Sequence, residues 1–236
     1  MRVLRGREGN IETDRTRTRE MAGRVGETGE RALRVWTPHR QVAFGRRDAR
    51  AEGYERACEA AEEREFPAIE RRVGGRAVAY TGSTVAFARA EPVADIRTDL
   101  DARYDAATAD LRAALSDLGV RTAVGEPPDS FCPGTHSLQA TKTDDGVGTG
   151  KLAGIAQRVG RGAALVAGVI VVDSAMEIAD VLKPIYDALE VPFDPSTVGS
   201  IERIGGETDP EVVLETIERT LVGDAGTVDV ERVDGR

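Results

Sequence analysis

Apolar residues recur every three or four positions in five segments of the chain, a spacing typical of amphipathic helices. The clearest case is 96–118, where Leu100, Leu111, Leu115 and Leu118 follow this spacing and Gly119 provides a C-cap. The predicted helices are 11–28, 53–64, 96–118, 174–189 and 209–222.

Short apolar or alternating segments between these helices predict strands. Segments 32–36 and 41–45 flank a short turn with Pro38 and are interpreted as a strand pair. Glycines separate the strands between 68 and 90, which indicates a β-meander. The apolar segment 162–173 predicts a central, buried strand. The predicted strands are 32–36, 41–45, 68–72, 76–80, 83–90, 137–141, 151–159 and 162–173.

Because strands outnumber helices and short loops join most neighbours, we expect an α/β fold of the α+β type. It would contain a mixed, mainly antiparallel sheet flanked by helices. We expect an N-terminal helical segment over 1–30, one main domain over 31–222, and a polar tail over 223–236 that frays.

The chain is acidic, with a net charge of −9 across its 236 residues. This charge argues against a nucleic-acid partner, because phosphate binding needs clustered Lys and Arg. Lys142, Lys151 and Lys183 are the only lysines. Acidic residues with so few lysines suggest a salt-loving cytoplasm, and a genome that favours Arg and Ala is the alternative. The polar N-terminus and the lack of an apolar segment of about 18 residues predict a cytoplasmic protein without a membrane span.

Lys151 begins the sequence KLAGIAQR, in which Gly154 and Ala156 leave room for a ligand. An ammonium group beside such a space can hold a carbonyl or phosphate oxygen. An ordinary lysine at the start of a strand is the alternative, but lysine is scarce here where arginine is common.

The sequence RRVGGRAVAYTGST, which begins at Arg71, combines cations with a flexible turn. Gly74 and Gly75 allow close approach of the backbone, and Arg72 and Arg76 flank them. Such a turn can hold a carboxylate, a phosphate or an acyl-adenylate. The alternative is a hairpin turn with solvated arginines.

Cys132 stands in the loop sequence SFCPGT, where a thiol would be accessible enough to react. Free cysteine has a pKa of about 8.5, so a nucleophilic thiolate needs support, which Lys151 could supply. A buried structural cysteine is the alternative. Cys58 lies in a helical sequence and is interpreted as structural.

The ordered motifs resemble the lipoate–protein ligase and octanoyltransferase family, which is related in fold to biotin–protein ligase. The resemblance rests on RRVGGRAV, KLAGIAQR and the apolar segment 162–173, with WTPHRQVAFGRRD before them. It covers about 31–189. The loop SFCPGTHSL with GKLAGIAQR looks most like the cysteine-dependent enzymes that move octanoate from the glycine cleavage H protein to other lipoyl domains.

The resemblance implies an acyltransferase in which Cys132 forms an acyl thioester and Lys151 holds the acyl carbonyl. It implies lipoyl-domain partners, namely the H protein and the E2 subunits of 2-oxoacid dehydrogenases, and neither a metal ligand nor a cofactor for transfer. The implied substrate-binding residues are Arg71, Arg72, Gly74, Gly75, Arg76, Tyr80, Gly154, Ala156 and Gln157.

The sequence departs from the ligase pattern at Arg76, which replaces a third glycine, and at Tyr80, which replaces a histidine. An ATP-dependent lipoate–protein ligase that uses ATP and Mg through a lipoyl-adenylate stays open as an alternative. A non-catalytic protein that binds lipoyl carriers is another. The sequence TKTDDGVGT also lengthens the connection between Cys132 and Lys151, so their contact depends on the fold.

Overall fold

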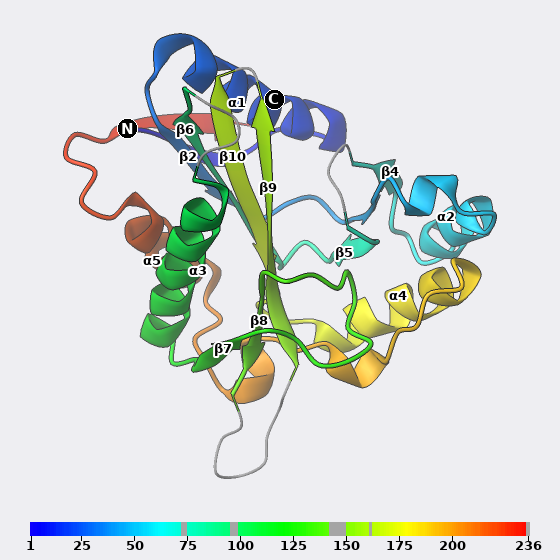
Figure 1. Cartoon of the computed structure of the whole chain (residues 1–236). Helices are drawn as coiled ribbons and strands as arrows, with labels where there is room; N and C mark the ends of the chain where they lie inside the picture. Colours follow the sequence, from blue (N-terminus) through cyan, green and yellow to red (C-terminus); the bar gives the residue numbers. More distant parts are fainter. Residues whose placement is uncertain (72–74, 95–98, 142–149, 161, 235–236) are drawn as a thin grey trace.

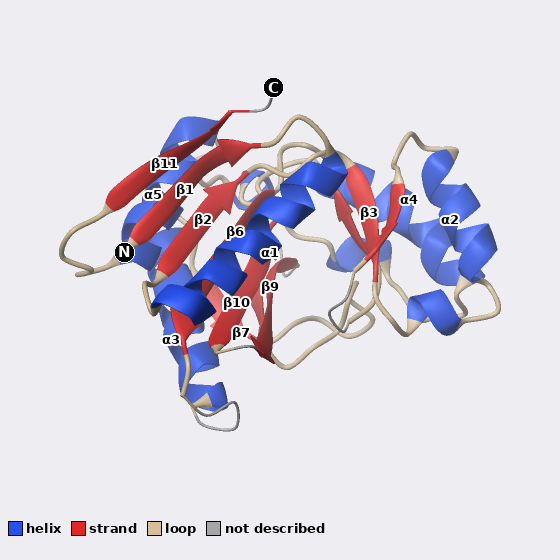
Figure 2. Ribbon diagram, turned by 90° about the horizontal axis from the view of Figure 1, so that it is seen from above, coloured by secondary structure: helices blue, strands red, loops and turns tan. Residues whose placement is uncertain are grey.

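The computed structural model of the chain describes residues 1–71, 75–94, 99–141, 150–160 and 162–234. Within these residues the strands form a sheet of eight and a sheet of three. Figure 2 shows the large sheet beside the smaller one that contains β3. Helices cover both sheets, and antiparallel pairs predominate in the large one, so the predicted mixed α/β fold is confirmed.

The large sheet has the strand order β11-β1-β2-β6-β10-β9-β8-β7, so β10 is an interior strand, as predicted. Its two parallel pairs join β1 to β11 and β1 to β2. In chain order the strands are β1 (Arg2–Arg7), β2 (Ala32–Trp36), β6 (Val85–Pro92), β7 (Thr122–Val124), β8 (Ser137–Ala140), β9 (Lys151–Gly160), β10 (Ala163–Ile170) and β11 (Asp229–Asp234).

All five predicted helices are present over the described residues, and three short 3-10 turns accompany them. The predicted start of the third helix, at 96–98, lies outside the described residues. The helices are α1 (Ile11–Thr28), α2 (Tyr54–Glu62), α3 (Leu100–Asp117), α4 (Ala175–Ala188) and α5 (Pro210–Val222), and the turns are η1 (Asp48–Arg50), η2 (Pro195–Thr197) and η3 (Glu202–Ile204).

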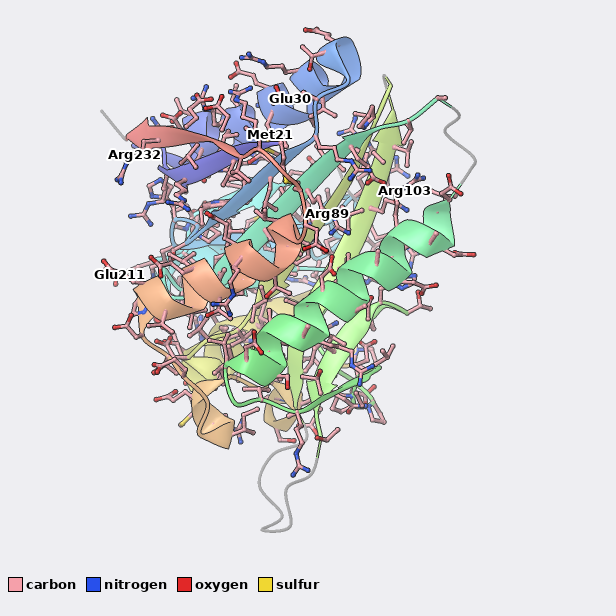
Figure 3. The ribbon with its side chains drawn as sticks, turned by 90° about the vertical axis from the view of Figure 1, so that its left-hand side faces the viewer. Met21, Glu30, Arg89, Arg103, Glu211 and Arg232 are labelled. Atoms are coloured by element: carbon pink, nitrogen blue, oxygen red, sulfur yellow. The ribbon has the colours of Figure 1, made fainter. Side chains whose placement is uncertain are left out.

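Strand alternation gives the large sheet two apolar faces. On β6, Phe87 belongs to the core beneath α3 and α5, whereas its neighbour Ala88 belongs to the core beneath α1. Figure 3 shows α3 and α5 side by side across their face of the sheet. Helix α1 begins where the Asn10 side chain accepts a hydrogen bond from the Thr13 N–H. Helices therefore cover part of each face of the large sheet.

The small sheet has the order β4-β3-β5 and lies beside the large one, with α2 and α4 packed near it (Figure 1). Its strands are β3 (Gln41–Phe44), β4 (Ala68–Glu70) and β5 (Val78–Tyr80). The predicted strand pair was wrong, because β2 pairs with β6 and β3 pairs with β4 and β5. The predicted meander was also wrong. Val42 and Phe44 are buried in the core formed with α2 and α4, which draws β3 away from the large sheet.

The two ends of the chain meet at the edge of the large sheet, where β1 and β11 run parallel from Arg2 opposite Asp229 to Arg7 opposite Asp234. The sequence analysis placed only a helix in 1–30 and missed β1. The prediction of a frayed tail after Gly223 was likewise wrong. Backbone hydrogen bonds hold this edge, and β11 is mostly polar, so neither strand has a strong hydrophobic pattern. None of the described helices has both the length and the apolar character that crossing a bilayer requires.

Candidate functional site

A cavity of about 820 Å³ lies where the two sheets meet. The small sheet contributes Ala43, Val78 and Tyr80 to its wall. The large sheet contributes side chains from β6, β9 and β10, and the loop after β7 contributes Cys132 and His136. The cavity thus combines apolar side chains and one thiol with many polar and charged side chains.

Cys132 has a left-handed backbone, with φ of 43°, which is costly for a residue other than glycine. Its N–H donates to the Tyr186 hydroxyl at 2.5 Å, and that hydroxyl donates to the Ala77 carbonyl at 3.0 Å. Tyr186 is fully buried on α4. A long-range hydrogen-bond chain therefore fixes the cysteine at the cavity wall.

Lys151 lies beneath the cysteine loop, and only 1% of the residue is exposed. Its Nζ donates to the Glu126 carboxylate at 2.6 Å, to the Phe131 carbonyl at 2.9 Å and to the Cys132 carbonyl at 2.7 Å. An ammonium has three donors, so all of them are used. The structure brings Lys151 and Cys132 together, but through the backbone of Cys132 rather than its sulfur. Lys151 lines the cavity and is nevertheless buried.

Arg71 is the cation that contacts the sulfur. Its Nη2 lies 3.2 Å from Cys132 Sγ and 2.7 Å from the Arg76 carbonyl oxygen. Burial alone lowers the pKa of Arg71, but the facing Cys132 sulfur and Tyr80 hydroxyl reverse this, so its pKa is raised overall. The guanidinium therefore stays charged beside the thiol.

Gly75 makes this approach possible. Its φ is 94°, and a Cβ there would lie 2.6 Å from Arg71 Nη2 and 2.8 Å from Cys132 Sγ. Any side chain would therefore separate or displace the two groups. Of the other residues predicted in this turn, Arg72 and Gly74 lie outside the described residues.

Arg76 and Tyr80 have different surroundings. The Arg76 guanidinium turns to the buried Asp48 carboxylate at 3.0 Å and is absent from the described cavity wall. Its position does not match the predicted substrate contact, because the buried carboxylate holds it. Tyr80 lines the cavity, and burial raises its pKa.

Strand β9 places Gly154, Ala156 and Gln157, three of the predicted substrate-binding residues, on the cavity wall. A Cβ on Gly154 would lie 3.7 Å from Lys151 Cε, so the glycine leaves space beside the lysine chain. The Gln157 side chain accepts from Arg103 Nε at 2.7 Å, and its backbone N–H donates to the Tyr104 hydroxyl at 2.9 Å. Gln157 therefore joins β9 to α3 as well as lining the cavity.

Sequence reasoning missed Glu126, which organises the cysteine loop. Its carboxylate accepts from Lys151 Nζ, from the Gly134 N–H at 2.8 Å and from the Ser137 hydroxyl at 2.8 Å. A lone acid in a Pro- and Gly-containing loop gave no signal for this role. Tyr186 was also missed, because nothing in a helical sequence indicates a contact with a loop more than 50 residues away.

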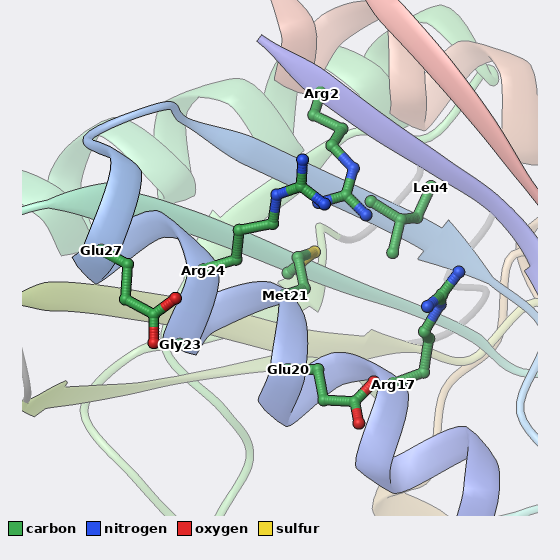
Figure 4. Close-up of a pocket in the computed structure, with 8 residues that line it drawn as sticks. All are labelled: Arg2, Leu4, Arg17, Glu20, Met21, Gly23, Arg24 and Glu27. Atoms are coloured by element: carbon green, nitrogen blue, oxygen red, sulfur yellow. The ribbon is translucent and has the colours of Figure 1, made fainter.

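A second, smaller cavity of about 380 Å³ lies between α1 and the edge of the large sheet. Figure 4 shows Arg2, Arg17 and Arg24 around it, with Met21 and Leu4 at its floor. Arg2 and Arg17 both bind the Glu231 carboxylate of β11. This cavity lies beside the ion pairs with Glu231 that connect β1 and α1 to β11.

The described residues contain no group of three or more His, Cys, Asp or Glu placed to hold a metal ion. A small-molecule group would be held in the large cavity, where Arg71 and Cys132 supply polar contacts and β6 and β10 supply apolar ones.

The model of the family described as the lipoyl protein ligase A/B catalytic domain matches residues 10–222. An octanoyl-GcvH:protein N-octanoyltransferase of Bacillus velezensis is 28% identical over 176 residues, which are 74% of this chain and 59% of that protein. The enzyme of the same name from Geobacillus kaustophilus is 27% identical over 130 residues, 55% of this chain and 44% of that protein. The chain thus spans less than two thirds of the length of these relatives.

Solved structures show the same fold. A lipoate-protein ligase A bound with ATP superposes with a TM-score of 0.74 at 16% identity, covering 99% of this chain and 89% of that one. A bi-partite lipoate protein ligase from Thermoplasma acidophilum gives a TM-score of 0.66 at 15% identity, covering 99% and 87%.

Proposed function

Because the chain belongs to the lipoyl protein ligase A/B catalytic domain family, we propose that it transfers an octanoyl or lipoyl group to a lipoyl-domain lysine. The acyl group would travel on Cys132. The matched relatives from Bacillus velezensis and Geobacillus kaustophilus carry the name of octanoyl-GcvH:protein N-octanoyltransferase, which supports this acyl group and this class of protein substrate.

One observation carries the proposal: Cys132 is the thiol on the wall of the large cavity, and long-range hydrogen bonds fix it there in a strained backbone conformation. Strain of this kind persists only where the surrounding structure enforces it, and it concentrates at functional sites. Cys58 has no such setting: it lies on α2, and burial raises the pKa of its thiol.

The reaction has two balanced half-steps. The Cys132 sulfur loses its proton and bonds to the acyl carbonyl carbon, the C–N bond to the donor lysine breaks, and the departing amine takes up one proton. The amine of the acceptor lysine then attacks the thioester, the C–S bond breaks, and the sulfur regains a proton. Neither half-step consumes ATP, so transfer needs no cofactor.

Lys151 would hold the acyl carbonyl oxygen while charge develops on it. Because its three donors are already engaged, it must exchange one of the two loop carbonyls for the substrate oxygen. Tyr80, Gly154 and Ala156 would contact the acyl chain along the cavity wall. The predicted substrate-binding set also includes Arg72, Gly74 and Gln157. Arg76 would affect substrate only indirectly, by shaping the turn in which it lies.

The proposed partners are the glycine cleavage H protein as donor and the lipoyl domains of 2-oxoacid dehydrogenase E2 subunits as acceptors, in the cytoplasm. The second candidate, an ATP-dependent lipoate–protein ligase using ATP and Mg, is favoured by the cavity volume of about 820 Å³, which would accommodate a ligand larger than an acyl chain. A carrier-binding protein without turnover is the third candidate.

The test is intact-mass spectrometry after incubation with octanoylated H protein and no ATP. We expect a mass gain of one octanoyl group, retained in Cys58→Ala and lost in Cys132→Ala. Transfer should fall at least about a thousandfold in Cys132→Ala, as for other nucleophile deletions. Full transfer by Cys132→Ala would exclude the thioester route. Lipoate-dependent ATP consumption without an adduct would indicate the ligase, and binding alone would indicate the carrier-binding protein.

A further inference from the structure

Two cations approach Cys132, and they contact different atoms of it. Lys151 Nζ lies 2.7 Å from the Cys132 carbonyl oxygen. Arg71 Nη2 lies 3.2 Å from Sγ, the atom that would attack the acyl group. The two positive charges therefore act on different parts of the residue.

We propose that Arg71 is a catalytic residue that holds the Cys132 thiolate, whereas Lys151 positions the loop that carries it. The proposal rests on the proposed function, in which Cys132 is the acyl carrier. It changes the assignment drawn from the sequence, where Lys151 was expected to support the thiolate and Arg71 to bind substrate.

The remaining contacts of Arg71 agree with this role. The Arg76 carbonyl fixes Nη2 at 2.7 Å, which holds the guanidinium against the sulfur. The Nε–H of Arg71 is buried and has no hydrogen-bond partner among the described residues. An unused buried donor is costly in a folded protein, and a water molecule, an ion or a ligand can supply its acceptor.

The other titratable groups around the sulfur do not supply the charge. Burial raises the pKa of Tyr80 and of Tyr186, so both phenols stay neutral at pH 7. The Lys151 charge is neutralised by Glu126 at 2.6 Å. Among the described residues, the guanidinium of Arg71 is the cation that contacts the sulfur.

Gly75 offers a second, independent way to test the contact between Arg71 and the Cys132 sulfur. A methyl group there would lie within 2.8 Å of both Arg71 Nη2 and Cys132 Sγ. Gly75→Ala therefore separates the two groups and leaves both in the chain. Arg71 itself transfers no proton, since guanidinium is not deprotonated in proteins. The thiol releases its proton to solvent when the thiolate forms, and the departing amine takes up one proton from solvent.

The test is the rate at which iodoacetamide alkylates Cys132, followed by intact mass in a Cys58→Ala background. We expect Arg71→Gln to slow alkylation about tenfold at pH 7, because a cation within 4–6 Å favours a charged partner by at least about that factor. At pH 10, where most thiols are ionised, the rates should converge. Arg71→Lys should recover part of the rate at pH 7.

Arg158→Gln is the matched control, because Arg158 also lines the cavity but is exposed, and its loss should leave the rate unchanged. Gly75→Ala should slow alkylation in the same direction as Arg71→Gln. Equal rates at pH 7 in wild type and in a folded Arg71→Gln variant would overturn the proposal, and a folded Gly75→Ala variant with the wild-type rate would overturn it where Arg71→Gln does not fold. The assay contains no acyl donor, so its outcome is independent of whether acyl transfer occurs.

Discussion

The large-sheet and small-sheet sides of the cavity each place a cation against Cys132, and the two cations are held differently. Lys151, on the large sheet, is 1% exposed and gives all three donors to the protein. Arg71, at the end of β4 in the small sheet, keeps a buried Nε without a partner among the described residues. Lys151 must therefore give up a contact with the protein before it can hold a substrate oxygen, whereas Arg71 has a donor in reserve. The same charge beside the same cysteine therefore does not imply the same role.

The largest effect should follow loss of the Lys151 charge. Lys151→Met leaves the Glu126 carboxylate partly buried and releases the Phe131 and Cys132 carbonyls, so we expect it to cost about 3–5 kcal/mol of unfolding free energy. The acyl adduct should also disappear. Urea denaturation measures the first effect and intact mass the second.

Lys183→Met is the matched control, because the Lys183–Asp187 pair is exposed and one helical turn apart. It should cost about 0.5 kcal/mol or less. If both variants lost equal stability, the buried contacts of Lys151 would not distinguish it from a surface lysine, and the contrast with Arg71 would fail.

A smaller effect should follow removal of the Tyr186 hydroxyl. Tyr186→Phe leaves the Cys132 N–H and the Ala77 carbonyl without this partner, which should cost about 1–3 kcal/mol in urea denaturation. Alkylation of Cys132 should also change, since its backbone is then free to leave the left-handed conformation. Tyr54→Phe is the control: burial raises the pKa of Tyr54 to about 12, and its hydroxyl faces Cys58 instead. A stable Tyr186→Phe variant with unaltered Cys132 alkylation would show that this hydrogen-bond chain does not position the cysteine.

The smallest effect should appear where β1 pairs with β11, because the ion pairs there are partly exposed. Burial by itself raises the pKa of Glu231, but hydrogen bonding from Arg2 and the charges of Arg17, Arg2 and Arg24 outweigh it, so its pKa is lowered. A lowered pKa stabilises the fold above the ordinary glutamate pKa of about 4.3, and this contribution is lost as pH falls through the folded-state value.

We therefore expect Glu231→Gln to cost about 1 kcal/mol or less at pH 7 and to match wild type once the carboxylate is protonated at low pH. Glu20→Gln is the control, because Glu20 is exposed on α1 beside the same small cavity. Thermal denaturation between pH 7 and pH 2 would measure both. A cost that stays constant over this range would mean that the charge of Glu231 contributes nothing to stability.

Much of the fold was predictable from local patterns. The helical spacing in α3 and the apolar run of β10 depend on neighbouring residues and are visible in the sequence. The motif around Cys132 and Lys151 indicated which residues to examine, and the structure brings the two together. Pairing of distant strands was not predictable in the same way, because backbone hydrogen bonds carry little sequence preference. β11 has a mostly polar sequence that also suits a loop.

The sequence by itself determined the helices, most strands, the acidic charge and the short set of residues that could perform chemistry, because each depends on composition or on spacing along the chain. Only the tertiary structure decided that β3 joins the small sheet, that β1 meets β11, and that Arg71 rather than Lys151 faces the Cys132 sulfur. Each of these is a contact between segments distant in sequence. Such contacts form because packing buries a whole set of residues together, and no local pattern records which partner a buried charge will have.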